Sequence, residues 1–177
     1  MLADASRFPS ALNATLLTNS LAANDEPLVH SGYARYREKL LTEGVDLYEL
    51  SPARTTRNKR LGIFGSSLGR LHAKTAVVDK RLVFLGSVNL DPRSATQNTE
   101  LGIAVQSPQL AREMLRIINI SKLESAYRVR IDPPTGKLEW LSMDEDQEIV
   151  LYDEPESSWL QRLKINLLGP LVPEDLL

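Results

Sequence analysis

The stretch LHAKTAVVDKRLVFLGS, residues 71–87, decides the fold class. It contains two short apolar runs, 72–78 and 81–85, separated by Asp79 and Lys80. Runs of this length, rich in Val, Leu and Phe and interrupted by turn residues, are typical of strands. We therefore expect a strand, a turn and a second strand here.

Similar runs outward from this stretch predict further strands at 14–19, 45–50, 101–105, 138–141 and 149–152. Helical spacing of apolar residues predicts a helix through 33–41, ended by Gly44. Ser107 can cap a second helix that begins at Pro108, and a third helix is expected over 159–168. The alternation of strands and helices predicts an α/β fold.

Composition excludes several classes of protein. The chain has 177 residues, 42% apolar and 25% charged, which is typical of one globular domain. It has no cysteine and only two histidines, so disulfide frameworks, thiolate metal sites and cysteine nucleophiles are excluded, and a multi-histidine zinc site is not expected. A net charge of -2 argues against a general nucleic-acid coat. Apolar runs fall far short of the ~20 residues that a membrane-spanning helix needs.

Charge is unevenly distributed along the chain. Residues 52–71 contain five basic side chains and no acidic one, whereas residues 139–156 contain eight acidic side chains and no Lys or Arg. We expect the acidic block to be a solvated face, and the basic run 54–70 to approach the entrance of the site. The helix at 159–168 is expected to pack against the core rather than lie on a membrane.

The residue types that can carry chemistry stand around the first pair of strands. His72 and Lys74 are two apart on a strand, so their side chains share a face, ~6.6 Å apart along it. Asn89 closes the sequence GSVN at 86–89, and Glu100 precedes the next strand. An imidazole can attack or protonate a phosphate ester while a lysine and an amide hold its oxygens. A carboxylate can orient the ring, so the pattern indicates a phosphate site.

This arrangement resembles a known signature. His72-x-Lys74-x4-Asp79, followed by Gly86-Ser87-x-Asn89, is similar to the HKD motif of the phospholipase D superfamily. Other segments resemble the cardiolipin synthase branch, particularly its bacterial C-type members: NLDPRS at 89–94, NTELG at 98–102, LTNSL at 17–21, HSGYARYR at 30–37 and the stretch 154–159. The resemblance implies a mixed sheet flanked by helices on both faces. It also implies one domain over 1–177, with the motif at 72–89 and an extension, 133–177, packed on it.

The resemblance further implies transfer of a phosphatidyl group through a phosphohistidine, with no metal and no cofactor. In the family two HKD motifs meet across a pseudo-twofold axis, one histidine acting as nucleophile and the other as general acid. By position, the catalytic residues are His72, Lys74, Asp79, Asn89 and Glu100. The phosphate-binding residues are Lys74, Ser87, Asn89, His30 and Arg93. Glu100 is expected to orient an imidazole, and Asp79 to hold its loop rather than touch substrate.

The sequence departs from the family pattern because it holds a single HKD motif. His30 cannot supply the second, since Gly32 stands where the lysine is required. Two explanations stay open: the chain is the C-terminal half of a two-motif enzyme, or it completes its site as a homodimer. In two-motif relatives the C-terminal histidine is assigned as general acid, which favours that role for His72.

The resemblance implies phosphatidylglycerol and a second phospholipid as substrates, and peripheral contact with the cytoplasmic side of the cell membrane, with no nucleic acid partner. One rival hypothesis is a homodimeric phosphodiesterase or nuclease of the same superfamily. The stretch DPRS at 91–94 favours the lipid branch. The other rival hypothesis is a catalytically silent binding domain. The presence of the full set of motif residues argues against it.

Overall fold

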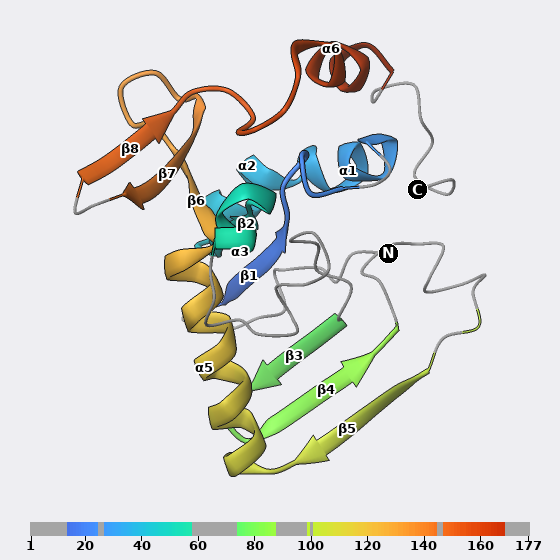
Figure 1. The fold of residues 1–177 in the computed structure, drawn as a ribbon. Coiled ribbons are helices and arrows are strands. Elements are labelled where there is room, and N and C mark those ends of the chain that lie inside the picture. Colours follow the sequence, from blue (N-terminus) through green and yellow to red (C-terminus); the bar gives the residue numbers. More distant parts are fainter. Residues whose placement is uncertain are drawn as a thin grey trace.

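The computed structural model describes residues 14–24, 27–57, 74–87, 99, 101–144 and 147–168. Their strands form two sheets, seen in the upper and lower parts of Figure 1. Sheet A has the order β1-β2-β6-β7-β8, made by Thr15–Asn19, Asp46–Leu50, Ala126–Ile131, Leu138–Asp144 and Gln147–Leu151. Sheet B has the order β3-β4-β5, made by Lys74–Val78, Leu82–Gly86 and Gly102–Gln106.

Sheet A is mixed, because β1 and β2 are parallel and its other pairs are antiparallel. Sheet B is antiparallel throughout. Its first hairpin turns at Asp79 and Lys80, whose φ angles are 51° and 55°. The Arg81 amide donates to the Val78 carbonyl at 3.1 Å and closes this turn, and three residues, 79–81, separate the paired Val78 and Leu82. The turn predicted between the two strands of the opening stretch is therefore confirmed.

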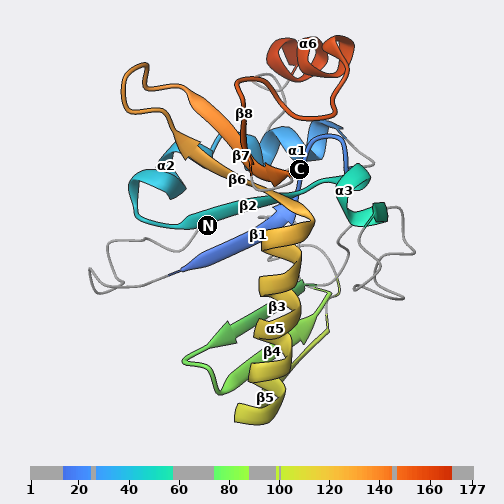
Figure 2. The same cartoon turned by 60° about the vertical axis from the view of Figure 1, so that its left-hand side comes forward.

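The described helices are α1 (Pro27–Ala34), α2 (Arg37–Thr42), α3 (Pro52–Arg57), α5 (Pro108–Glu124) and α6 (Trp159–Leu168). The long helix α5 packs against strands of both sheets and connects β5 to β6, as Figures 1 and 2 show. The Ser107 hydroxyl accepts a hydrogen bond from the amide of Leu110, 3.2 Å away, so the predicted cap of this helix is confirmed.

The core lies on one face of sheet A, where Leu47, Tyr127, Val129 and Trp140 pack together. Side chains from α1 and α2 cover this face. Helix α5 covers the opposite face, with Lys122 Nζ 4.5 Å from the ring centroid of Tyr48. The expected α/β fold, with a mixed sheet flanked by helices on both faces, is thus confirmed, although the described strands are divided between two sheets.

Two local predictions need correction. The helical pattern through 33–41 forms two helices, because residues 35–36 make a turn between α1 and α2. Strand β6 was not predicted, since AYRVRI at 126–131 follows the helix with one residue, Ser125, between them. Gly44 does follow the second helix as expected, with φ at 86°. At such a φ, glycine adopts the conformation at no steric cost.

The acidic block is not simply a solvated face. Glu139 is only 2% exposed and pairs with Arg130 across the β6–β7 pair. Glu154 and Glu156 also bind groups of sheet A and its helices, as described below. The prediction failed because a run of like charges does not reveal basic or hydroxyl partners that come from distant parts of the chain.

The expectation for the last helix is also wrong. Its bounds, 159–168, agree with the prediction, but its large apolar side chains are exposed rather than packed against the core. The periodicity of the sequence locates an apolar stripe without indicating which way that stripe faces.

Candidate active site

All three strands of sheet B have one end at the same edge of the sheet, the edge that runs across the strands. Lys74 begins β3 and pairs with Gly86, which ends β4, and Gly86 pairs with Gly102, which begins β5. The predicted residues His72, Asn89 and Glu100 are two, three and two positions along the chain from these strand ends. Those three residues and Arg93 lie outside the described residues.

Ser87, predicted to bind phosphate, ties this edge together. Its amide donates to the carbonyl of Leu101 at 2.9 Å, and its hydroxyl accepts from the amide of Leu101 at 3.1 Å. The hydroxyl also lies 3.3 Å from the Leu101 carbonyl, to which it donates. The side chain therefore joins the end of β4 to the residue that precedes β5. Phosphate binding by Ser87 stays a prediction.

The two glycines at this edge are held against the ring of Phe84. A Cβ added to Gly102 would lie 2.4 Å from that ring, and one added to Gly86 would lie 2.9 Å from both the ring and the Leu101 carbonyl oxygen. Side-chain atoms essentially never approach so closely. The absence of a side chain at both positions lets Phe84 cover the strand ends next to Lys74.

Replacing Gly102 by Val should therefore disturb this edge. The added side chain must displace the Phe84 ring, and overpacking of this kind typically costs about 1–3 kcal/mol in the free energy of unfolding. Urea denaturation of the two proteins measures the difference. Gln106→Val, at an exposed position of the same strand that pairs with Leu82 rather than Phe84, is the matched control and should change stability by less than about 0.5 kcal/mol. Equal stability of Gly102→Val and the unmodified protein would contradict the close contact.

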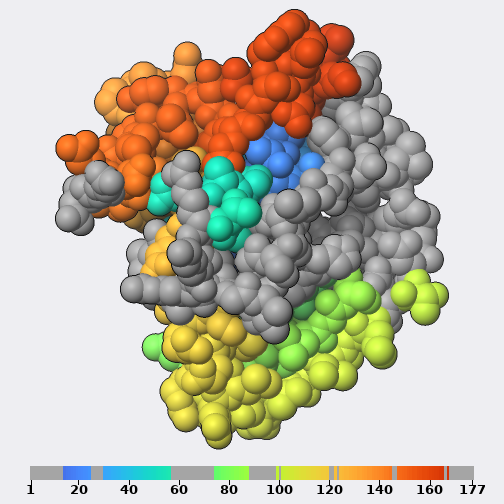
Figure 3. All heavy atoms as spheres, in the orientation of Figure 1, coloured from blue at the N-terminus to red at the C-terminus, as the bar shows by residue number. Residues whose placement is uncertain are grey.

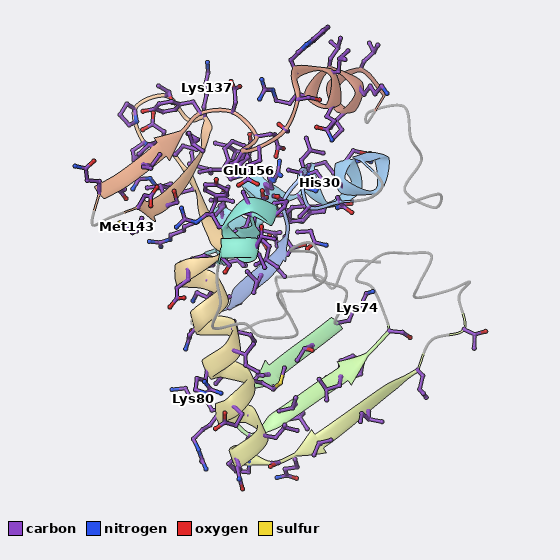
Figure 4. The ribbon with its side chains drawn as sticks, in the orientation of Figure 1. His30, Lys74, Lys80, Lys137, Met143 and Glu156 are labelled. Atoms are coloured by element: carbon purple, nitrogen blue, oxygen red, sulfur yellow. The ribbon has the colours of Figure 1, made fainter. Side chains whose placement is uncertain are left out.

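Asp79 lies at the other end of the hairpin from Lys74. The strand between them has five residues, which span about 16 Å at the usual rise per residue. Figure 4 shows Lys74 and Lys80 at opposite ends of β3 and its turn. The proposal that Asp79 holds its loop, rather than contacting substrate, agrees with this placement and stays a proposal.

His30, the other predicted phosphate ligand, lies in a buried polar cluster on α1 (Figure 4). Its Nε2 is 2.8 Å from Nη2 of Arg37 and 3.8 Å from Oε1 of Glu154. Its Nδ1 is 3.4 Å from Nδ2 of Asn24, and its ring meets Tyr33 edge-on. The imidazole is 1% exposed, so contact with substrate by His30 remains a prediction that requires this cluster to open.

Arg37 is the centre of the cluster. It donates to Glu49 on β2 at 2.7 Å and to Glu154, beyond β8, at 2.5 Å, and its guanidinium also faces the rings of Tyr33 and Trp140. Glu49 is fully buried and accepts two further hydrogen bonds, from the Tyr33 hydroxyl at 2.8 Å and the Trp140 indole at 2.9 Å. The cluster thus joins α1, α2, β2, β7 and the C-terminal segment.

Sequence reasoning missed Arg37, Glu49 and Glu154 as a group. The signal available was a glutamate in the strand DLYEL on the same face as Leu47, because a carboxylate on a buried face requires a buried partner. Its partner Arg37 is 12 positions away on another element, and Arg37 in turn binds Glu154, 117 positions away, so the group depends on tertiary contacts.

Glu154 has a strongly shifted pKa. Burial raises its pKa, but the interactions with His30 and Arg37 outweigh burial and lower the pKa to about 2. Burial and the Glu49 charge together raise the pKa of the Tyr33 hydroxyl well above its usual value. The cluster is therefore arranged around a protonated Arg37 guanidinium, an ionised Glu154 carboxylate and a neutral Tyr33 phenol.

Stability should therefore fall in acid. Because the folded-state pKa of Glu154 is lower than its unfolded value, its contribution is complete above pH ~4.5 and is lost as pH falls toward ~2. A shift of this size corresponds to about 3 kcal/mol. Urea denaturation between pH 6 and pH 2.5 should show a shallower pH dependence for Glu154→Gln than for the parent. Parallel curves for the two proteins would contradict a paired carboxylate at position 154.

A second carboxylate, Glu156, anchors the start of α3. It accepts hydrogen bonds from the Ser51 hydroxyl, the Ala53 amide at 3.1 Å and the Tyr127 hydroxyl at 3.0 Å. Arg54, the first residue of the basic run, donates to the Met143 carbonyl at 2.6 Å and faces the Tyr127 ring. Arg54 is therefore a structural residue and not a free surface charge, and the other basic side chains of the run lie outside those that the structure describes.

Within the described residues, no group of three or more His, Asp or Glu side chains is arranged to hold a metal ion. No helix of the described residues is long and apolar enough to cross a membrane.

The family model described as cardiolipin synthase, phospholipase D-like domain, matches residues 11–120. The chain belongs to this family. The match includes α1, sheet B and the predicted HKD motif, and it ends within α5. The part of the chain that carries Glu154, Glu156 and α6 lies beyond the match.

Similar proteins extend the likeness over most of the chain. Cardiolipin synthase C of Escherichia coli (strain K12) is 44% identical over 165 residues, which cover 92% of this chain and 34% of that protein. Two proteins of Helicobacter pylori, each named as uncharacterized, are 31% identical over 95% of this chain and 32% of their own length. The chain thus spans about a third of the length of these relatives. No solved structure matches it significantly.

Proposed function

We propose that this phospholipase D-like domain is part of a phosphatidyltransferase of the cardiolipin synthase type. The observation that carries the proposal is the 44% identity to cardiolipin synthase C over 92% of the chain. The geometry of sheet B supports the proposal. Lys74, Gly86 and Gly102 are paired at one edge of the sheet. The residues His72, Asn89 and Glu100 are two or three positions from them in the sequence.

The proposed reaction uses two histidines, one as nucleophile and the other as general acid and base. The nucleophilic imidazole forms a bond to the phosphorus of the donor phospholipid while the phosphorus–oxygen bond to the leaving alcohol breaks. The other imidazole protonates that leaving oxygen, and it then removes the proton from the hydroxyl of the acceptor lipid. The acceptor displaces the first histidine, which completes the transfer. We assign His72 the role of general acid and base.

The neighbouring residues complete the proposed site. Lys74 and Asn89 hold the non-bridging oxygens and stabilise the charge that develops on them in the transition state. Glu100 orients an imidazole, and Ser87 and Arg93 add contacts to phosphate. The acceptor is phosphatidylglycerol, whose free glycerol hydroxyl forms the new phosphate ester, and the donor is a second phospholipid, so the protein works in peripheral contact with the cytoplasmic side of the membrane.

The second histidine is proposed to come from another HKD unit, either an N-terminal half or a second copy of the chain. The monomeric chain alone should then show less than about 1% of the turnover of the completed enzyme, because one imidazole cannot act as nucleophile and acid in the same step. The assay compares the monomer with the chain mixed with a separately expressed HKD half of a matching synthase. Robust cardiolipin formation by a strictly monomeric sample would overturn the two-histidine scheme.

A further inference from the structure

Helix α6 turns its apolar side away from the protein. Four of its large apolar side chains are at least half exposed: Trp159 (65%), Leu160 (50%), Leu163 (52%) and Leu167 (66%). At 100° per residue they fall within an arc of about 100°. The partly buried residues Gln161, Arg162 and Ile165 lie on the opposite side. A helix of a water-soluble protein normally does the reverse, with its apolar stripe toward the core.

This orientation is held in place by polar contacts at the start of the helix. Ser158 and Gln161 form a reciprocal cap: the Gln161 amide donates to the Ser158 hydroxyl at 3.2 Å, and the Ser158 amide donates to the Gln161 side chain at 2.8 Å. Arg162 donates to the carbonyl of Ser157 at 3.4 Å. The polar side of the helix is thereby fixed against the chain, and helix α1 packs against it. The apolar arc is left exposed on α6, the helix at the top of Figures 1 and 3.

The charges of α6 match an anionic surface. Residues 159–168 contain Arg162 and Lys164 and no acidic residue. Lys164 is exposed and stands four residues after Leu160, beside the apolar arc. At ten residues the helix is about 15 Å long, half the thickness of the bilayer hydrocarbon, so it can lie in the interface but not span it. An exposed Trp is well suited to that depth.

We propose that the outer face of α6, formed by Trp159, Leu160, Leu163, Lys164 and Leu167, binds a bilayer surface that contains anionic phospholipid. The choice of a bilayer as the partner of this face rests on the proposed function, in which the substrates are lipids. Arg54, the first residue of the basic run, does not belong to this face, since it is engaged with the Tyr127 ring and the Met143 carbonyl.

Tryptophan fluorescence tests the contact on the unmodified chain. The sequence has two tryptophans, and Trp140 is buried while Trp159 is exposed. Vesicles of phosphatidylglycerol and phosphatidylcholine should shift the emission to the blue, and brominated lipid should quench it. The variant Trp159→Phe should bind the same vesicles without these changes. A blue shift that persists in Trp159→Phe, or no shift in the parent at saturating vesicle concentration, would overturn the proposal.

Vesicle sedimentation tests the same face by substitution. Leu163→Glu should lower the partition constant at least about tenfold, because a carboxylate replaces an inserted apolar group. Lys164→Gln should lower it about fivefold at low salt. Met143→Glu is the matched control, because Met143 is 54% exposed on β7, and it should bind like the parent. Equal binding by Leu163→Glu and the parent would overturn the proposal.

Self-association is the competing explanation, and the same variants decide it. If Leu163→Glu changes the oligomeric state of the lipid-free protein in sedimentation velocity, and leaves vesicle binding unchanged, the face is a protein interface and the proposal fails. Lipid transfer is measured separately. Vesicle binding through α6 without transfer by the completed enzyme would remove the proposed function and leave this inference standing.

Discussion

Replacing Arg37 by Ala should lower the free energy of unfolding by about 3–5 kcal/mol, the usual effect of removing one partner from a buried ion pair. Arg37 is 3% exposed and is bonded to Glu49 and Glu154. Its removal leaves the fully buried Glu49 carboxylate with no cation, hydrogen-bonded to Tyr33 and Trp140 alone among the contacts described. Urea denaturation at pH 7 measures the loss.

Arg116 supplies the control for this prediction. It pairs with Glu113 on the exposed surface of α5, at 3.0 Å. Exposed pairs contribute little, so Arg116→Ala should change the free energy of unfolding by less than about 0.5 kcal/mol. If Arg37→Ala and Arg116→Ala have equal effects, the buried cluster does not stabilise the fold as described.

Replacing His72 by Asn should reduce kcat of the completed enzyme at least about 100-fold, because the loss of an essential acid or nucleophile typically has an effect of this size. Vesicle binding and the thermal unfolding temperature should be retained. Lys80→Ala is the matched control, because Lys80 is exposed in the turn at the far end of the same hairpin. More than about 1% residual turnover in His72→Asn would remove His72 from the mechanism.

Local signals were sufficient for most elements of the fold. The turn at Asp79 and Lys80, the cap at Ser107 and the bounds of the last helix follow from residue types and spacing close to one another in the chain. Register was not predictable in this way. The alignment of Lys74, Gly86 and Gly102 at one edge arises from pairing between strands, as does the close contact of both glycines with Phe84.

Long-range contacts account for the failures. The acidic run gave no indication that Glu154 and Glu156 are paired, because their partners Arg37 and Ser51 are over 100 residues away in the sequence. Likewise, the apolar period of α6 located a stripe but not its direction, which depends on the polar contacts made by Ser158, Gln161 and Arg162. At the candidate site the HKD motif indicated the residue types and their order, while the buried surroundings of His30 required the folded arrangement.

The central claim is phosphatidyl transfer between lipids, and product analysis tests it most directly. The chain, completed by a complementary HKD half, is incubated with vesicles of phosphatidylglycerol labelled in its phosphate. The account predicts that label appears in cardiolipin, that free glycerol is released because phosphatidylglycerol serves here as both donor and acceptor, and that both products disappear with His72→Asn. Phosphatidic acid as the sole labelled product, or cleavage of a nucleic acid with no lipid product, would contradict it.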